Sequence, residues 1–240
     1  MFRTLLLLST LILTQSTLAS IRGNRTITLT SMCDDIILTN DQEFLLCTHS
    51  FTINLEIFKN NGFGFESHQL LQFDSVPGQL TMALNSKIYV LCQNDLKVIK
   101  QEVNGTFTQS ILLALSTAFS FFLISKDEEM LILGSSSVVE IWRKNPTDYA
   151  LHQTLPHGIG SNGLALSADE KEILICSSFL IIYKHNGANF VLSQNILLGF
   201  FGGYVNYING LVEVHGSSSQ LKFYEFDGTE YVYKFDIQTG

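Results

Sequence analysis

Short apolar runs and turn-forming residues alternate along most of the chain. The stretch IIYKHNGANFVLSQNI, residues 181–196, has an apolar run, an Asn-Gly turn and a second run that opens with phenylalanine, which is the pattern of a β-hairpin. The first run recurs as LEIFK (55–59), LKVIK (96–100), VEIWR (139–143), LIIYK (180–184) and LKFYE (221–225). The starts are 41, 43, 41 and 41 residues apart, so the hairpin belongs to a repeat.

Two more strand candidates precede each hairpin, which makes four strands in each repeat. The first of the four reads DDIILTN, GQLTMAL, AFSFFLI, NGLALSA and YVNYING in the five copies. Strands such as 130–133 and 180–183 are apolar at both parities, so both faces of their sheets must be covered. Sheets stacked around an axis cover both faces, whereas a β-sandwich leaves one face of each sheet exposed to solvent.

The spacing therefore predicts an all-β fold, a β-propeller of five four-stranded antiparallel blades. We expect the blades at about residues 33–73, 78–113, 118–155, 161–198 and 203–238, with the first strand of each nearest the axis. A further strand candidate, 26–30, precedes the first blade. It either widens the edge of the fifth blade or is a remnant of a missing one.

The stretch LSADEKEILICSSFLIIYKHN, residues 166–186, resembles the repeat core S-P-D-G-x-x-L…x-V-Y of YVTN-type β-propellers, with Ser167, Asp169, Leu174 and Tyr183 at matching positions. The whole region 26–240 resembles the WD-repeat and YVTN-like propellers by its period. Trp142 is followed by arginine instead of aspartate, which favours the looser YVTN-like type. Most such proteins have six to eight blades, so a five-bladed ring and an incomplete arc both remain open. We expect a closed or nearly closed monomer.

The amino terminus has the pattern of a signal peptide. One basic residue, Arg3, precedes an apolar core over 5–13, and small residues follow up to Ala19. We expect cleavage after Ala19, a β-propeller domain over 20–240 and a secreted or secretory-pathway location. The alternative, a membrane anchor, is disfavoured because the apolar core is about half as long as a spanning helix. No other segment is long enough to span a membrane.

The net charge and the glycosylation sequons limit the classes of partner that the protein can bind. The formal net charge is −8, without a cluster of basic residues, which argues against nucleic acid and anionic membranes. Secretion would expose two N-glycosylation sequons, at Asn24 and Asn104, while Asn145 is excluded by the proline that follows it. The remaining partner classes are a protein or a glycan.

Three of the four cysteines, Cys47, Cys92 and Cys176, share one repeat position, where the other copies have glycine. Equivalent positions in neighbouring blades are too far apart for a disulfide, so these three are expected to be small buried residues and to give at least three free thiols. Cys33 has no obvious partner, although a bridge to Cys47 is conceivable. No CxxC or HxxH spacing marks a metal site, and no cofactor is expected.

Catalytic patterns are sparse. A glycosidase needs two carboxylates on different inner strands, but only the first inner strand contributes acids, Asp34 and Asp35. Propeller lactonases, by resemblance, hold a metal with Glu, Asn and Asp around the channel. Asp35, Asn162 and Asn206 could supply part of such a set, without a glutamate.

The expected function is therefore a non-catalytic module that binds a protein or glycan, with a propeller hydrolase or lactonase as the alternative. The loop residues Phe200 and Phe201 lie among glycines just before an inner strand and are the expected contact residues. His157, in the loop LPHGIGSNG, is a weaker candidate for the same rim.

Overall fold

The computed structural model describes residues 33–49, 51–83, 87–157, 160, 162–208, 210–216 and 220–238. The predicted signal peptide, the candidate strand 26–30 and the sequon at Asn24 lie outside these residues. Twenty strands form five four-stranded antiparallel sheets, each ordered as the chain runs. The predicted β-propeller fold is confirmed. The described residues form no helix, and thus none that could cross a membrane.

The strands of each blade are given in chain order. Blade 1 has β1 (Asp35–Leu38), β2 (Phe44–Thr48), β3 (Asn54–Asn60) and β4 (Phe65–Gln72), and blade 2 has β5 (Pro77–Met82), β6 (Ile88–Cys92), β7 (Asp95–Gln101) and β8 (Phe107–Ala114). Blade 3 has β9 (Phe121–Ile124), β10 (Met130–Gly134), β11 (Val138–Lys144) and β12 (Tyr149–Pro156). Blade 4 has β13 (Gly163–Leu166), β14 (Glu172–Cys176), β15 (Phe179–His185) and β16 (Phe190–Leu197), and blade 5 has β17 (Gly202–Ile208), β18 (Leu211–Gly216), β19 (Gln220–Phe226) and β20 (Tyr231–Gln238).

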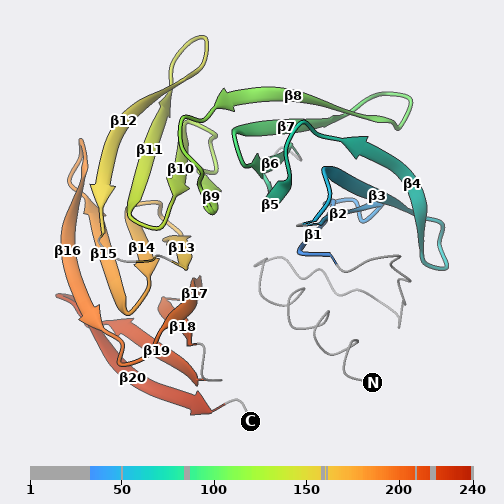
Figure 1. The fold of residues 1–240 in the computed structure, drawn as a ribbon. Helices are drawn as coiled ribbons and strands as arrows, with labels where there is room; N and C mark the ends of the chain where they lie inside the picture. The colour runs from blue at the N-terminus through green and yellow to red at the C-terminus, as the bar shows by residue number, and fades with distance from the viewer. Residues whose placement is uncertain are drawn as a thin grey trace.

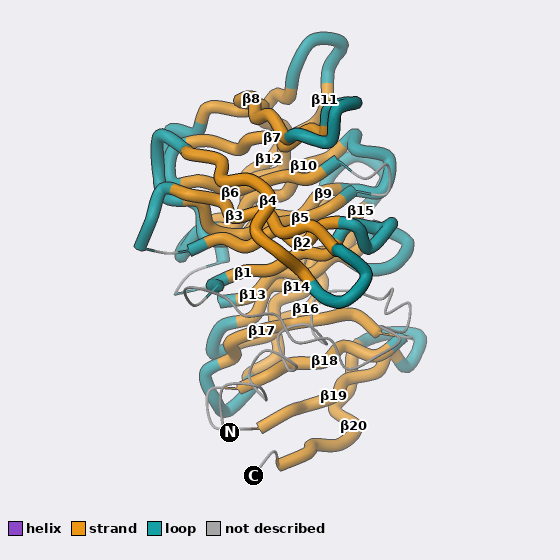
Figure 2. The backbone as a smooth tube through the Cα atoms, turned by 90° about the vertical axis from the view of Figure 1, so that its right-hand side faces the viewer, coloured by secondary structure: helices purple, strands orange, loops and turns teal. Residues whose placement is uncertain are grey.

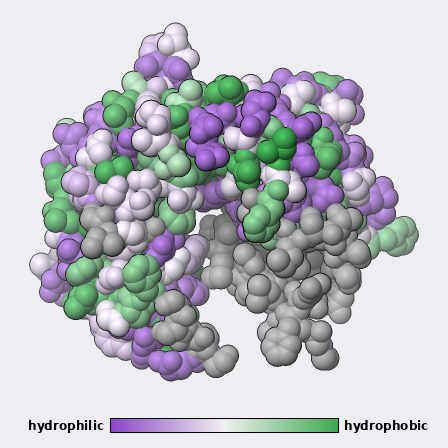
Figure 3. Space-filling model, viewed as in Figure 1, coloured by the Kyte–Doolittle hydropathy of each residue, from purple (hydrophilic) through white to green (hydrophobic). Residues whose placement is uncertain are grey.

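The five blades follow one another around an arc with the first strand of each nearest the axis (Figure 1). Inner strand β1 packs on β5, β5 on β9, β9 on β13 and β13 on β17. No comparable packing joins β17 back to β1 within the described residues. The space-filling view is hollowed at the centre of the arc (Figure 3). The expected closed or nearly closed ring is thus wrong for the described part of the chain, which forms an open arc.

The hydrophobic core is divided into layers between blades. Four clusters of buried side chains each combine residues from two consecutive blades, and a fifth covers the face of blade 1 that is turned away from blade 2. The second strand of a blade lies in the middle of these layers: all five residues of β2, β6 and β10 are buried. This explains why these strands are apolar at both parities.

Tight turns close the outer hairpins on the rims of the arc, where the loops gather in the view of Figure 2. In blade 4 the side-chain oxygen of Asn186 accepts hydrogen bonds from the backbone N–H groups of Ala188 and Asn189, and Gly187 has a φ of 103°. Asn61, Asn145 and Asp227 cap the equivalent turns in the same way. The Asn-Gly and Asp-Gly signals therefore have a local mechanism.

Glutamine side chains link the outer strands of consecutive blades. The amide of Gln153 in blade 3 accepts a hydrogen bond from Phe190 N at 2.9 Å and donates one to Phe190 O at 2.7 Å. Two further blades use the same clamp, Gln69 on Phe107 and Gln194 on Tyr231. In blade 5 the equivalent residue is Phe235, 46% exposed and stacked on Phe223 of the same blade.

The structure corrects the predicted number of free thiols. Cys33, just before β1, forms a disulfide with Cys47 in β2, and their Cα atoms are 5.5 Å apart. Cys92 and Cys176 are free and buried. Two free thiols replace the expected three, because the antiparallel pairing of β1 with β2 brings Cys33 within reach of Cys47. The three equivalent cysteines are not bonded to one another, as expected.

The glutamine clamps generate a test of the inter-blade account. Replacing Gln153 with alanine leaves the N–H and C=O of Phe190 without their partners, so the free energy of unfolding should fall by about 1–3 kcal/mol. The matched control is Thr154→Ala, at the adjacent exposed position, which should change it by less than about 0.5 kcal/mol. Denaturant titration of both variants measures this, and equal effects would contradict the clamp.

Candidate functional site

Asp35 is the only carboxylate on the five inner strands as the structure bounds them. It is the first residue of β1 and is partly buried. Its Oδ2 accepts a hydrogen bond from Leu80 N of the next inner strand at 2.7 Å, and its Oδ1 accepts one from Ile36 N at 2.9 Å. These two bonds fix the orientation of the carboxyl group beside the axis.

Burial raises the pKa of Asp35 to about 6. The hydrogen bonds from Leu80 and Ile36 lower the pKa and so act against this shift, while the nearby charge of Asp34 raises it further. A carboxyl group with a pKa near 6 is mostly ionised at neutral pH and is a stronger base than an ordinary aspartate. Asp35 is thus a candidate for proton transfer on the inner strands.

The three polar side chains that the resemblance to propeller lactonases would place around a metal each make a hydrogen bond with the backbone in this structure. The two oxygens of Asp35 already accept backbone hydrogen bonds, the amide of Asn162 donates to Gly202 O at 3.0 Å, and Asn206 Oδ1 accepts from Tyr207 N at 2.9 Å. No glutamate lies on an inner strand within the described bounds. These three residues serve the backbone of their own or neighbouring strands.

Gln79 is a second polar group beside the axis. It lies on inner strand β5, next to Leu80, and its Oε1 accepts a hydrogen bond from Phe122 N of β9 at 2.7 Å. Its NH₂ group donates no hydrogen bond to any described residue, and a ligand oxygen could accept one from it. Asp35 and Gln79 therefore offer an acceptor and a donor on adjacent inner strands.

The two phenylalanines expected on the rim have different environments. Phe200 is partly buried against the core between blades 4 and 5, and its ring fills the space that a side chain on Gly216 would need: a Cβ there would come within 2.5 Å of the ring. Lys222 Nζ lies 5.0 Å from the ring centroid. Phe201, in contrast, is 48% exposed, and its ring lies near Gly160 of the preceding loop. Of the pair, Phe201 is the one available to a ligand.

His157 lies at the end of blade 3, where its backbone N–H donates to Ser137 O at 3.2 Å. Burial lowers its pKa below the usual value. Both ring nitrogens are shielded from solvent, and backbone groups of Val138 and Ser135 act against the lowering of the pKa. Its ring therefore presents no polar atom to a ligand in this arrangement.

A cluster that sequence spacing missed lies in blade 1. Cys33, Cys47 and His49 bring their sulfur and nitrogen atoms within 4.8 Å of one another. The absence of CxxC or HxxH spacing excluded only clusters built along one segment, whereas this one is assembled across paired strands. His49 two residues after Cys47 was the available signal, because residues two apart in a strand share a face.

No family model matches the sequence, and no curated protein matches it either. Solved structures do resemble the fold. A protein from Lactobacillus plantarum is 12% identical, with a TM-score of 0.72 over 84% of this chain and 70% of that one. The periplasmic gluconolactonase PpgL of Pseudomonas aeruginosa is 10% identical, with a TM-score of 0.69 over 85% and 70%. A candidate 6-phosphogluconolactonase from Bacteroides uniformis is 12% identical, with a TM-score of 0.72 over 85% and 70%.

These likenesses show the fold alone. At identities of 10 to 12%, they support a β-propeller and do not name a WD-repeat or YVTN family. The matched region covers 70% of each neighbour's chain.

The packing of the two phenylalanines predicts different effects on stability. Phe200→Ala removes a ring that fills the space above Gly216 and should lower the free energy of unfolding by about 2 kcal/mol. The neighbouring change Phe201→Ala removes an exposed ring and should alter it by less than about 0.5 kcal/mol. Thermal or denaturant unfolding of the two variants provides the comparison. A larger loss from Phe201→Ala would contradict the arrangement.

Proposed function

We propose that the chain is a hydrolase of cyclic esters, acting on sugar-type lactones at the inner face of the arc. The observation that carries the proposal is Asp35, a carboxylate on an inner strand whose pKa is raised to about 6. The names of structural neighbours support the same class, since one is a periplasmic gluconolactonase and another a candidate 6-phosphogluconolactonase. These two observations favour the lactonase alternative of the sequence analysis over a purely non-catalytic module.

Lactone hydrolysis requires a base near the carbonyl carbon. The Asp35 carboxylate takes a proton from water, and the resulting hydroxide equivalent attacks the lactone carbonyl. The ring C–O bond then breaks, the ring oxygen receives a proton, and a hydroxy acid results. The backbone N–H groups of Leu80 and Ile36 hold the carboxylate in place. The NH₂ group of Gln79 can donate to a substrate oxygen. In this proposal Asp35 carries the proton.

The location of the protein is part of this proposal. The predicted signal peptide and the Cys33–Cys47 disulfide both fit an oxidising, extracytoplasmic compartment. Asn104 lies in the exposed turn between β7 and β8, where its Oδ1 accepts a hydrogen bond from the Thr106 hydroxyl at 2.7 Å. Its exposure supports use of that sequon.

The test is lactone turnover by purified protein. Wild type should hydrolyse glucono-lactone or its 6-phosphate, and Asp35→Asn should lower kcat/KM by on the order of 10²- to 10⁴-fold. The matched control is Asp34→Asn, which changes an exposed carboxylate one residue away and should keep most of the activity. Activity should fall as the pH drops below about 6, because the base becomes protonated. No turnover by wild type, or equal activity of the two variants, would overturn the proposal.

Stability gives an independent readout of the same residue. The folded-state pKa of Asp35 is raised above its unfolded value, so the ionised group destabilises the fold and the loss is complete above pH 6. The cost at neutral pH is up to about 3 kcal/mol, since one pKa unit corresponds to about 1.4 kcal/mol. Wild type should therefore gain stability from pH 7 towards pH 4 relative to Asp35→Asn. Parallel pH dependences in denaturant titrations would contradict the raised pKa.

A second candidate function, binding of a protein or glycan, is favoured by the exposed ring of Phe201 beside Gly160. An aromatic ring on a rim loop is a usual contact for either ligand. Pull-down from extracellular fluid with wild type and Phe201→Ala distinguishes this role, because Phe201→Ala should retain lactone turnover. An unchanged partner list removes Phe201 from this candidate function.

A further inference from the structure

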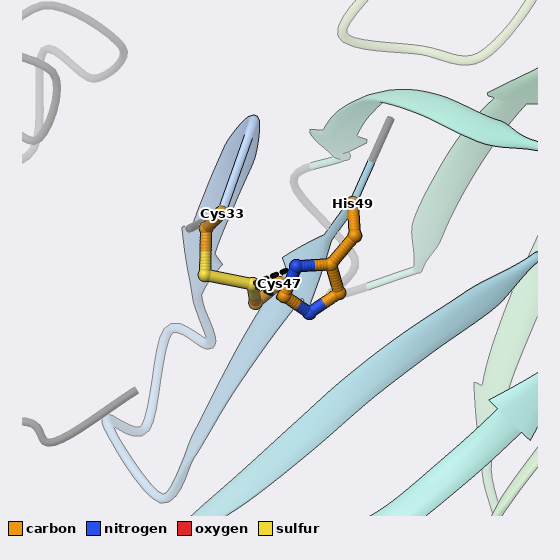
Figure 4. Close-up of side chains that lie close together, drawn as sticks. All are labelled: Cys33, Cys47 and His49. Atoms are coloured by element: carbon orange, nitrogen blue, oxygen red, sulfur yellow. Dashed lines mark hydrogen bonds between the residues drawn. A yellow bond between two sulfur atoms is a disulfide. The ribbon is translucent and has the colours of Figure 1, made fainter. Parts of the chain in front are cut away.

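Three potential metal ligands, Cys33, Cys47 and His49, meet on the face of blade 1 that is turned away from blade 2, and Glu56 lies beside His49. His49 Nε2 is 3.4 Å from Cys47 Sγ and 3.3 Å from Glu56 Oε2, and Cys33 completes the group through its bond to Cys47 (Figure 4). The register of β2 with β3 pairs Cys47 with Glu56. Cys47 is completely buried, and the side chain of His49 is 8% exposed. The cluster therefore lies in the interior of the protein.

The rest of the repeat has no equivalent of this cluster. Cys92 and Cys176 occupy the position of Cys47 in blades 2 and 4, but the residues two positions later are Asn94 and Ser178. The positions that correspond to Glu56 hold Lys97 and Ile181. A small buried residue is thus sufficient for propeller packing at this position. Blade 3 also has a glutamate, Glu140, at the position of Glu56, but among the five blades only blade 1 combines it with two cysteines and a histidine.

We propose that, when the Cys33–Cys47 disulfide is reduced, blade 1 binds one Zn²⁺ ion through Cys33, Cys47, His49 and Glu56. Two sulfurs, an imidazole nitrogen and a carboxylate oxygen form a donor set that Zn²⁺ prefers. In a tetrahedral site, ligand atoms at zinc–ligand distances of about 2.0–2.3 Å lie about 3.3–3.8 Å apart. The Cys47–His49 and His49–Glu56 distances, 3.4 and 3.3 Å, already match those edges. The two sulfurs must separate, and the Glu56 carboxylate must move towards them, because only the ligand atoms of Cys33, Cys47 and His49 already lie within 4.8 Å of one another.

The disulfide-bonded state and the zinc-bound state of the site exclude each other. A dithiol reductant converts the disulfide to two thiols and is itself oxidised to a disulfide, with two electrons transferred. Zn²⁺ then binds the two thiolates and releases their protons to solvent. Re-oxidation needs both sulfurs to form their mutual bond, so bound zinc protects them. The oxidised site crosslinks β1 to β2, and the reduced site joins the same strands through the metal.

The experiment uses the full mature chain, reduced under nitrogen with a dithiol and transferred to metal-free buffer. Titration with Co²⁺, followed by competition with Zn²⁺, should show one thiolate-bound ion per reduced chain and none per oxidised chain. Cys33→Ser and His49→Ala should each weaken binding by about 100-fold or more, because each removes a ligand. Cys92→Ser, which removes a buried thiol outside the cluster, is the matched control and should bind as wild type does.

A second measurement on wild type avoids variants that fail to fold. Zn²⁺ should slow the return of the disulfide in air by at least about tenfold, whereas Mg²⁺, which prefers oxygen ligands, should not. Three results would each overturn the proposal: no thiolate-bound cobalt in the reduced chain, equal affinity in Cys33→Ser or His49→Ala, or a disulfide that excess dithiol does not reduce in the folded protein. None of these readouts depends on lactone turnover.

Discussion

The fold depends on one constraint: the second strands of blades 1 to 4 are almost entirely apolar on both faces, so these sheets must be covered on both sides. Stacking along an arc satisfies this constraint, and the four inter-blade clusters are its result. The same stacking sets the first strands side by side around the axis. Polar side chains there, such as Asp35 and Gln79, reach the backbone of the next inner strand instead of solvent alone. The candidate site is thus a consequence of how the blades pack.

Local signals predicted most of the fold. The repeat, the Asn-Gly and Asp-Gly turns and the two-faced apolar strands were sufficient for strand order and blade number, because each acts within about 40 residues of sequence. Closure could not be predicted, since it depends on the angle between packed blades and on the number of blades. The environment of Phe200 could not be predicted for a similar reason, because it is decided by Gly216, on another strand. The glycine at a position shared with Cys47 was a signal that space there had to be left for another side chain.

Asp35 was visible in the sequence but was set aside because it has no acidic partner across the axis. In the structure, the relevant feature is the environment of this single carboxylate and not the presence of a second carboxylate. Burial raises the pKa of Asp35, and the proposed base chemistry requires one such carboxylate, whereas a glycosidase requires a pair. The Cys33–Cys47–His49–Glu56 cluster depends on cross-strand register in the same way. Both sites are formed by strand pairing, so the spacing of their residues along the sequence gives little sign of them.

The open arc is the central claim, and distances between blades measure it directly. Spin labels can be attached to cysteines at Phe63, Ala188 and Thr229, which are exposed and equivalent positions in the turns of blades 1, 4 and 5. The pair on blades 4 and 5 reports the spacing of adjacent blades. In an open arc, the pair on blades 1 and 5 should be clearly farther apart than this reference in pulsed electron resonance. Equal distances for the two pairs would mean a closed five-bladed ring and would contradict the account.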